Sequence, residues 1–378
     1  MRSLVGALEF SASDGTVVTS ALRQLSPSAS ASGKGTRVND SFYARSAVYN
    51  RLEQTFGGAP SSPIAVMAYG SEQEAGGKSD SAIGGVAPAF TDVPSDVQRY
   101  AAWGAVFGGW TTQSGDSNAA KTNSTIGGLM TGIDATVFDD WRFGVLAGYS
   151  RSTFNVNALS SSGRSDNYTF GTYASTEWAA PNGAIAFRSG LADTWHNLEM
   201  SRNVAFAGFS DNIISDYDAG TFQIFGELGY RLHVSDRSLI EPYANLAYVR
   251  VMTDGFSEKG LNGAALDIDA DAMETTLSTL GIRATTRFQL GHVATTARTD
   301  LGWRHAVGDR IPLSTASFAA GSSAFTASGA SIGKDVTLIA AGLDFQLCSN
   351  TSLGIAYQSQ FGSGVTQNGL SANFSVKF

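Results

Sequence analysis

Apolar and polar residues alternate with a period of two from residue 100 to the carboxy-terminus. The stretch WRFGVLAGYS (141–150) is typical, with aromatic or aliphatic residues at every odd position. Successive side chains of a β-strand point to opposite faces, so each such stretch predicts a strand with one apolar face. Twelve strands are expected, near residues 100–112, 122–137, 141–150, 167–178, 184–200, 221–234, 238–252, 273–288, 292–306, 333–347, 351–361 and 366–378.

The connections between these strands alternate in length. Short turns are predicted near residues 139–140, 181–183, 235–237, 291 and 349–350. Long polar loops are predicted near residues 156–165, 202–218, 253–271 and 307–332. Short turns on one side and long loops on the other, with an even number of strands, are the layout of bacterial outer-membrane barrels.

Charged residues on the polar faces favour a lipid-facing exterior and a water-filled interior. A packed core would pay a large desolvation cost for them, whereas an aqueous lumen accepts them. The predicted pore-lining residues are Glu227, Arg231, Glu241, Arg250, Arg283, Arg287, Arg298, Asp300, Arg304 and Asp344. Aromatic residues at strand ends predict two interfacial girdles: Trp103, Trp110, Trp141, Tyr149, Tyr168, Trp178, Trp195, Tyr248, Trp303 and Phe378.

The predicted fold class is therefore all-β: a 12-stranded antiparallel transmembrane β-barrel over residues 99–378. The strands also exceed the five or so residues common in soluble sheets, and about nine to eleven are needed to cross a bilayer. A soluble sandwich or a lipocalin-like barrel is the alternative that the alternation leaves open.

The first hundred residues lack this period-two alternation. Residues 41–56 have apolar residues at helical spacing, and we expect a helix there. Residues 57–98 are rich in Gly, Ser, Pro and Ala and predict a flexible linker. The start of the chain lacks a cleavage site, so we expect a fragment of a longer precursor.

Composition narrows the possible functions. Only 15% of residues are charged, and the net charge is −8, which argues against nucleic-acid binding. The single cysteine, Cys348, excludes a disulfide framework. We therefore expect neither a cofactor nor a metal.

Three short patterns could carry chemistry, and each has a simpler explanation. Residues 115–118 (GDSN) lack the strand-to-helix context of an esterase nucleophile. The acidic stretch 267–274 lacks the glycine and glutamate spacing of a calcium loop. Asn39 precedes Asp40 before the predicted helix, and a helix cap explains this pair. The barrel is accordingly predicted not to be an enzyme.

Several segments, in order, resemble the C-terminal translocator (β) domain of classical (type Va) autotransporters. They are residues 21–30, 40–52, 103–110, 239–251, 278–284, 301–309 and the final strand. The resemblance implies an integral barrel in the outer membrane of a Gram-negative bacterium. It also implies secretion or surface display of an N-terminal passenger, through or beside the pore.

The resemblance assigns expected roles and partners. It implies that residues 1–56 form the segment at the passenger end of the barrel and that the helix of residues 41–56 plugs the pore. There the helix offers Arg45, Asn50, Arg51 and Glu53 to a lumen of mixed charge. An assembly signal is expected at Gly369, Ala372, Phe374, Val376 and Phe378. Expected partners are outer-membrane lipid, the passenger, the barrel assembly machinery and periplasmic chaperones, with the barrel itself a monomer. A passive porin and an outer-membrane enzyme are the alternative functions.

Overall fold

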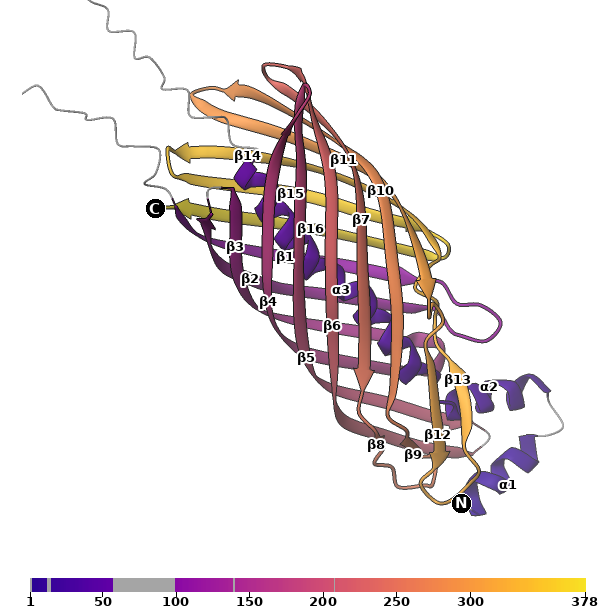
Figure 1. Ribbon diagram of the computed structural model, residues 1–378. Coiled ribbons are helices and arrows are strands. Elements are labelled where there is room, and N and C mark those ends of the chain that lie inside the picture. Colours follow the sequence, from indigo (N-terminus) through magenta and orange to yellow (C-terminus); the bar gives the residue numbers. More distant parts are fainter. Residues whose placement is uncertain (1, 12–14, 57–98, 139, 207) are drawn as a thin grey trace, which may run out of the picture.

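In the computed structural model, which describes residues 2–11, 15–56, 99–138, 140–206 and 208–378, twelve antiparallel strands close a barrel (Figure 1). The predicted number and topology are confirmed. The barrel strands are β1 (Tyr100–Gln113), β2 (Thr122–Val137), β3 (Trp141–Val156), β4 (Ser161–Ala180), β5 (Gly183–Phe206), β6 (Phe209–Ser235), β7 (Ser238–Thr253), β10 (Asp271–Leu290), β11 (Val293–Gly308), β14 (Asp335–Cys348), β15 (Thr351–Gly362) and β16 (Val365–Lys377).

Pairing of the first and last strands closes the barrel. Their register runs from Ala101 opposite Lys377 to Gln113 opposite Val365. Beyond it, the Phe378 amide donates to the Tyr100 carbonyl at 2.9 Å. Closure matters because hydrocarbon offers no hydrogen-bond partner to a free strand edge.

Two of the four predicted long loops are strands instead. Residues 202–218 were expected to be a loop, yet β5 and β6 pair up to Phe206 opposite Phe209. Residues 156–165 likewise contain only a short turn before β4. The polar composition of these residues indicated loops, but a strand whose outer face is exposed to water also has polar residues on that face.

The other two long connections carry a second sheet. It has four strands: β8 (Phe256–Ser257), β9 (Leu266–Ile268), β12 (Leu313–Phe318) and β13 (Phe325–Ser328). Leu266, Ile268 and Ala316 form its small buried cluster, with Phe318 packed against them. This sheet, which the sequence did not predict, belongs to the same end of the barrel as the long connections.

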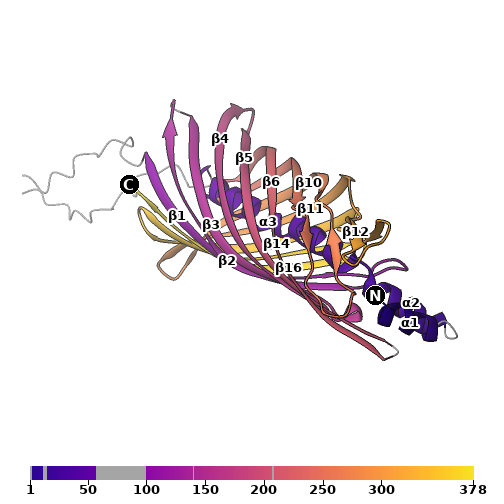
Figure 2. The same ribbon diagram turned by 90° about the horizontal axis from the view of Figure 1, so that it is seen from below.

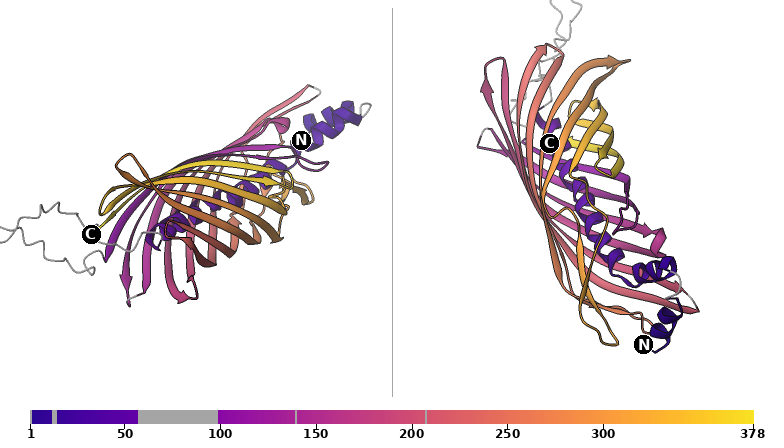
Figure 3. Two further views of the ribbon diagram at one scale, coloured as in Figure 1. Left: turned by 90° about the horizontal axis from the view of Figure 1, so that it is seen from above. Right: turned by 90° about the vertical axis from the view of Figure 1, so that its right-hand side faces the viewer.

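Three helices precede the barrel: α1 (Arg2–Ser11), α2 (Gly15–Leu25) and α3 (Ser28–Phe56). α3 runs inside the ring of strands, whereas α1 and α2 lie beyond one end of it (Figures 2 and 3). That end is opposite the carboxy-terminus (Figure 1). None of the helices in the described part of the chain is both long and apolar enough to cross a lipid bilayer.

α3 begins well before the predicted helix of residues 41–56. Its additional residues, 28–40, are mainly Ser, Ala, Gly and Thr with interspersed charges, and they form no apolar stripe. Helix propensity without amphipathicity is a weak signal, and here the surrounding barrel supplies the packing. The predicted linker, residues 57–98, lies outside the described residues.

The outer faces of β5 and β6 change from largely apolar to mostly polar at about Trp195. The inner face gains a buried apolar cluster beyond it, and it also keeps the buried ion pair of Arg202 with Glu258. Up to Trp195, the outer face is largely apolar, as at Leu191 and Ile224, and the inner face contains buried charges such as Arg188. Beyond it, the outer positions are mostly polar or charged. The inner face there joins α1 and α2 in one buried cluster, comprising Leu4, Ala21, Leu25, Val204, Phe206, Phe209, Ile213 and Ala264.

Candidate functional site

The lumen and the helix that fills it form the candidate site. α3 has polar residues on most of its surface, and they are buried because strands surround it. Buried polar residues of α3 are Ser28, Ser30, Ser32, Lys34, Thr36, Arg37, Asn39, Ser41, Arg45 and Arg51. A buried polar group is costly unless it is hydrogen-bonded, so the position of α3 depends on partners in the wall.

At the end with the long connections, the chain after β13 packs directly on α3. A Cβ atom at Gly329 would lie 2.3 Å from the backbone nitrogen of Ser32, so glycine is required for this approach. The Ala330 amide donates to the Ser32 hydroxyl at 3.1 Å, and the Gln113 side chain donates to the Ala330 carbonyl at 3.3 Å. The connection therefore closes this mouth of the barrel around the helix.

A salt bridge joins the helix to the acidic stretch that was considered as a calcium loop. The Lys34 ammonium lies 2.5 Å from the Asp271 carboxylate. Burial lowers the pKa of Lys34, while the carboxylate opposes that shift. Within the described ranges, no group of three or more metal-ligating side chains comes together. Asp271 is thus a partner of the helix.

In the middle of the lumen, an aromatic side chain of α3 packs on the first strand. Tyr43 stacks on Phe107 with ring centroids 5.1 Å apart. Its hydroxyl donates to the Asn368 carbonyl at 3.3 Å. A Cβ atom at Gly109 would lie 1.7 Å from that hydroxyl, so a side chain there would displace the ring. Tyr43 therefore fixes the helix against the β1–β16 seam.

Nearer the end with the short turns, Asp134 of β2 links the helix to several strands. Arg51 approaches it with two nitrogens, at 2.7 and 2.8 Å, and also donates to the Ser375 hydroxyl at 2.7 Å. Arg142 and the Tyr173 hydroxyl donate to the same carboxylate at 2.5 and 2.8 Å. A bidentate arginine–carboxylate pair fixes direction as well as distance. We call Arg51 and Asp134, together with Arg142, the Asp134 cluster.

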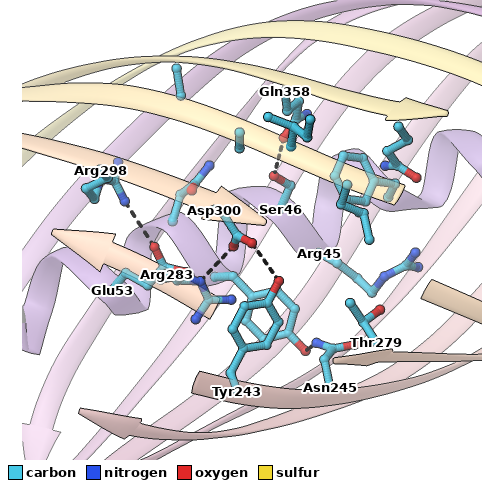
Figure 4. A pocket seen from close by; sticks show the side chains of 18 of the residues that line it. Arg45, Ser46, Glu53, Tyr243, Asn245, Thr279, Arg283, Arg298, Asp300 and Gln358 are labelled. Atoms are coloured by element: carbon cyan, nitrogen blue, oxygen red, sulfur yellow. Dashed lines mark hydrogen bonds and ion pairs between the residues drawn. The ribbon is translucent and has the colours of Figure 1, made fainter. Parts of the chain in front are cut away.

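Two residues further along α3, Glu53 lies between two wall arginines (Figure 4). Its carboxylate is 3.1 Å from Arg283 and 3.2 Å from Arg298. Arg298 also lies 2.6 Å from Asp344, to which Gln54 donates at 3.0 Å. Helix and wall therefore alternate in charge at this level.

A second layer of charges lies within the wall and orients these arginines. Arg283 donates to the Glu227 carboxylate at 2.7 and 2.8 Å. Arg188, 1% exposed, lies 2.8 Å from Glu227 and 2.5 Å from Glu241. Removing any one member would leave an oppositely charged side chain buried and unpaired, which is more costly than losing an exposed pair.

The GDSN segment forms an ordinary turn. Asp116 accepts hydrogen bonds from the backbone amides of Asn118 and Ala119 at 2.7 and 2.8 Å. These amides lower the pKa of the Asp116 carboxyl. The loop lies between two strands, so Ser117 lacks the setting of a hydrolase nucleophile.

Comparison with known proteins identifies the family of this chain. The family model for the autotransporter β-domain matches residues 102–358. The chain belongs to the autotransporter β-domain family. An extracellular serine protease of Serratia marcescens is 31% identical over 358 residues, which is 95% of this chain and 31% of that protein. This autotransporter chain thus spans about a third of the length of that relative.

Two solved autotransporter barrels share the fold. The β-domain of the Bordetella autotransporter BrkA is 20% identical, with a TM-score of 0.55 over 74% of this chain and 100% of that one. The translocator domain of NalP from Neisseria meningitidis is 12% identical, with a TM-score of 0.57 over 75% and 90%. The autotransporter barrel is an integral outer-membrane translocator and not a catalytic domain.

Most predicted lumen residues of the autotransporter barrel come together as described, with one exception. Arg250 lies on the outer face of β7, where its side chain is 45% exposed and 3.5 Å from Glu274. The prediction that it lines the pore is wrong, because the inward positions of β7 are odd-numbered, as at Glu241 and Tyr243. Arg287 and Arg231 both border a cavity of about 250 Å³ at the end with the short turns.

One girdle prediction is also wrong. Trp103 is 5% exposed and points into the lumen, where its indole donates to the Tyr173 hydroxyl at 2.6 Å. Outward positions of β1 are even-numbered, and Trp110, which is 48% exposed, occupies one of them. An aromatic residue close to a strand end does not reveal which face it occupies unless the parity is read as well.

Several lumen residues were missed that the same pattern could have found. Asp134 and Arg142 both alternate with outward apolar neighbours, and Arg142 stands between Trp141 and Phe143. Arg188 occupies an equivalent position between outward residues of β5. The signal was a charge at the inward parity of a predicted strand, and it was applied mainly to the later strands.

The residues of the predicted assembly signal divide between the two faces of β16. Phe374 and Phe378 are 46% and 61% exposed on the outer face, which Ala372 and Val376 share by parity. Gly369 faces inward, where a Cβ atom would lie 3.1 Å from the Tyr43 ring. Their role in assembly stays a prediction.

Proposed function

We propose that this barrel anchors and exports a passenger attached on the N-terminal side of α1. α3 then remains in the lumen as a plug. The observation that carries the proposal is that α3 occupies the lumen and pairs with the wall along its length, from Lys34 to Gln54. Outer-membrane barrels place short turns in the periplasm and long loops outside. The start of α3, at the end with the long connections, is therefore on the extracellular side.

The similarity to the Serratia protein supports the proposal. It covers 95% of this chain, which is more than the barrel strands alone. The rest of that protein, which is named an extracellular serine protease, is the larger part. We infer that this chain also carries a passenger with an extracellular role.

The secretion proposal can be tested in a Gram-negative host. An epitope placed before Met1 is expected to bind antibody on intact cells, whereas an epitope in the Asp236 turn, on the opposite side, needs permeabilised cells. The reverse pattern would reject the proposed direction of export.

The plug proposal can be tested in planar bilayers. Arg51→Ala with Glu53→Ala removes the helix side of two ion-pair clusters, and we expect a severalfold larger single-channel conductance. The matched control, Arg151→Ala with Glu199→Ala, also removes one charge of each sign, but from exposed outer positions. Equal conductance of both variants would contradict the plug and favour an open porin.

We further propose that the outward aromatic residues of β16 are read by the barrel assembly machinery, with periplasmic chaperones delivering a monomer. Phe378, which is 61% exposed, directly follows β16, the strand that closes the barrel. Phe378→Ser is expected to lower the amount of folded barrel in the outer membrane severalfold. Phe170→Ser, at a similarly exposed position of β4, is the control. Equal losses in the two variants would indicate a general need for apolar surface.

A further inference from the structure

A cavity beside α3 contains two buried arginines whose hydrogen-bond acceptors are neutral. The cavity has a volume of about 150 Å³ and lies between α3 and the wall formed mainly by β7, β10, β11, β14 and β15 (Figure 4). Arg45 from α3 and Arg304 from β11 line it, and each is 5% exposed. Arg45 donates to the Gln223 side chain at 2.7 Å, and Arg304 donates to the Gln360 side chain at 2.6 Å.

The charges at this part of the cavity are not balanced. Considering residues 2–11, 15–56, 99–138, 140–206 and 208–378, neither Arg45 nor Arg304 forms an ion pair with a carboxylate. The charged side chain that acts on Arg304 is Arg45, another cation. The carboxylates that border the same cavity, such as Glu53, already have arginine partners. Two like charges away from water are costly without a counter-charge.

Unused hydrogen-bond donors point to the missing counter-charge. The Nε atom of Arg304 and the Nε2 atom of Gln360 are buried, and neither has a partner among the residues described. Gln360 is 1% exposed and lines the same cavity. Buried polar groups are nearly always hydrogen-bonded. A site with two cations and two free N–H donors has the chemistry to bind an anion.

We propose that a small inorganic anion, of a size between chloride and phosphate, binds in this cavity between Arg45 and Arg304. It accepts hydrogen bonds from the Arg304 Nε and Gln360 Nε2 atoms. The volume holds such an anion with some water, since a water molecule takes up about 30 Å³ in the liquid. Because Arg45 belongs to the helix and Arg304 to the wall, the anion joins them. The inference goes beyond the export proposal and does not depend on a passenger.

Bromide allows a direct test on the unmodified protein. Crystals of the full chain grown in sodium bromide are expected to show an anomalous peak in the cavity, within contact distance of Arg304 Nε and Gln360 Nε2. Bromide peaks confined to the exterior, or no peak, would overturn the proposal.

Thermal unfolding in detergent gives a second test. At constant ionic strength and pH, replacing gluconate with chloride is expected to raise the Tm of the wild-type barrel until the site is saturated. Arg304→Gln should abolish this rise. In gluconate, its Tm should be no lower than that of the wild type, because the variant removes an unbalanced charge. Arg164→Gln, an exposed outer position, is the control and should keep the rise.

Each alternative result has one interpretation. A chloride effect that persists in Arg304→Gln would place the anion elsewhere and reject the site. An effect of the same size with phosphate and with chloride would indicate charge recognition, whereas a difference would identify the anion that fits. Should Arg304→Gln not fold, Arg45→Gln removes the other cation and is expected to lose the same rise.

Discussion

The β5–β6 hairpin contains two regions that have the same alternation but outer faces of opposite polarity. The inner face of the upper region adds an apolar cluster to its buried charges, such as Arg202. Below Trp195, Ile224 is exposed on the outer face and Gln223 beside it is buried in the lumen. Above it, Asp216 is exposed on the outer face and Tyr217 is buried. The hydrogen-bonded ladder runs through both regions without interruption. Backbone pairing is therefore independent of polarity, and the surroundings of each face decide which residues it tolerates.

Different solvents explain the inversion. Hydrocarbon surrounds the lower region, so apolar residues face outward, and the charged lumen residues are satisfied by α3 and by one another. Water surrounds the upper region, so its outer face is polar, and the inner face buries apolar residues against α1 and α2. The chain thus combines a membrane barrel with an upper part that packs like a soluble protein.

The largest expected effect is at a lumen position of β2, in the membrane-spanning part of the barrel. Asp134→Ala leaves Arg51 and Arg142, whose side chains are 2% and 8% exposed, without their shared carboxylate. We expect the free energy of unfolding to fall by about 3–5 kcal/mol, as when one partner of a buried ion pair is removed. Urea titration in phospholipid vesicles measures it. Asp216→Ala, an exposed position of the upper region, should be nearly neutral, and equal losses would refute the contrast.

An outer position of the lower region comes next. Ile224→Arg puts a cation into the lipid, and about 2–4 kcal/mol of stability should be lost, as for arginine near the bilayer midplane. The same titration in vesicles measures this loss. A stability equal to that of the wild type would show that residue 224 does not face lipid.

The inner face of the upper region should respond less. Ile213 is 1% exposed and packs in the cluster that includes Leu25 of α2. Ile213→Ala should cost about 2 kcal/mol, the lower end for such truncations. A change of 1.4 kcal/mol alters an equilibrium constant tenfold, so the fraction of molecules with α2 detached should rise about tenfold or more. Trypsin should therefore cleave after Arg23 faster by the same factor. Ile214→Ala, the adjacent outward residue, is the control. Equal cleavage rates would show that the cluster does not hold α2.

The smallest effect is expected on the outer face of the upper region. Ile214 is 51% exposed and Ile224 is 50% exposed, in the same strand. Ile214→Arg should change the free energy of unfolding by less than about 0.5 kcal/mol, because its side chain meets water. A loss as large as that of Ile224→Arg, measured in the same vesicles, would extend the bilayer above Trp195 and remove the distinction between the two regions.

Much of the barrel could be predicted because strand alternation is a local property. The number of strands followed from counting the alternating stretches, and the antiparallel barrel followed from their even number and their connections. The positions of most inward charges, such as Glu227 and Arg283, followed from their parity within those stretches. Prediction failed where parity was not read, as at Trp103 and Arg250. It also failed where composition was used in its place, as at residues 202–218, whose polar residues form the outer face of a strand.

The site was less predictable, because its members are distant in sequence. Nothing local to Arg51 indicates that its partner is Asp134, or that Glu53 lies between Arg283 and Arg298. Arg51 and Glu53 of the helix lie in the lumen, and their pairs depend on how the barrel closes around the helix.

The sequence by itself determined that this chain makes strands with two unlike faces, because alternate side chains must point in opposite directions. The tertiary structure decided where along the strands the outer face passes from lipid to water, and which lumen residues meet the helix. It also decided that residues 28–40, with no apolar stripe of their own, become helical. The physical reason is that burial and charge pairing depend on what surrounds a segment, and the barrel creates those surroundings only when it closes.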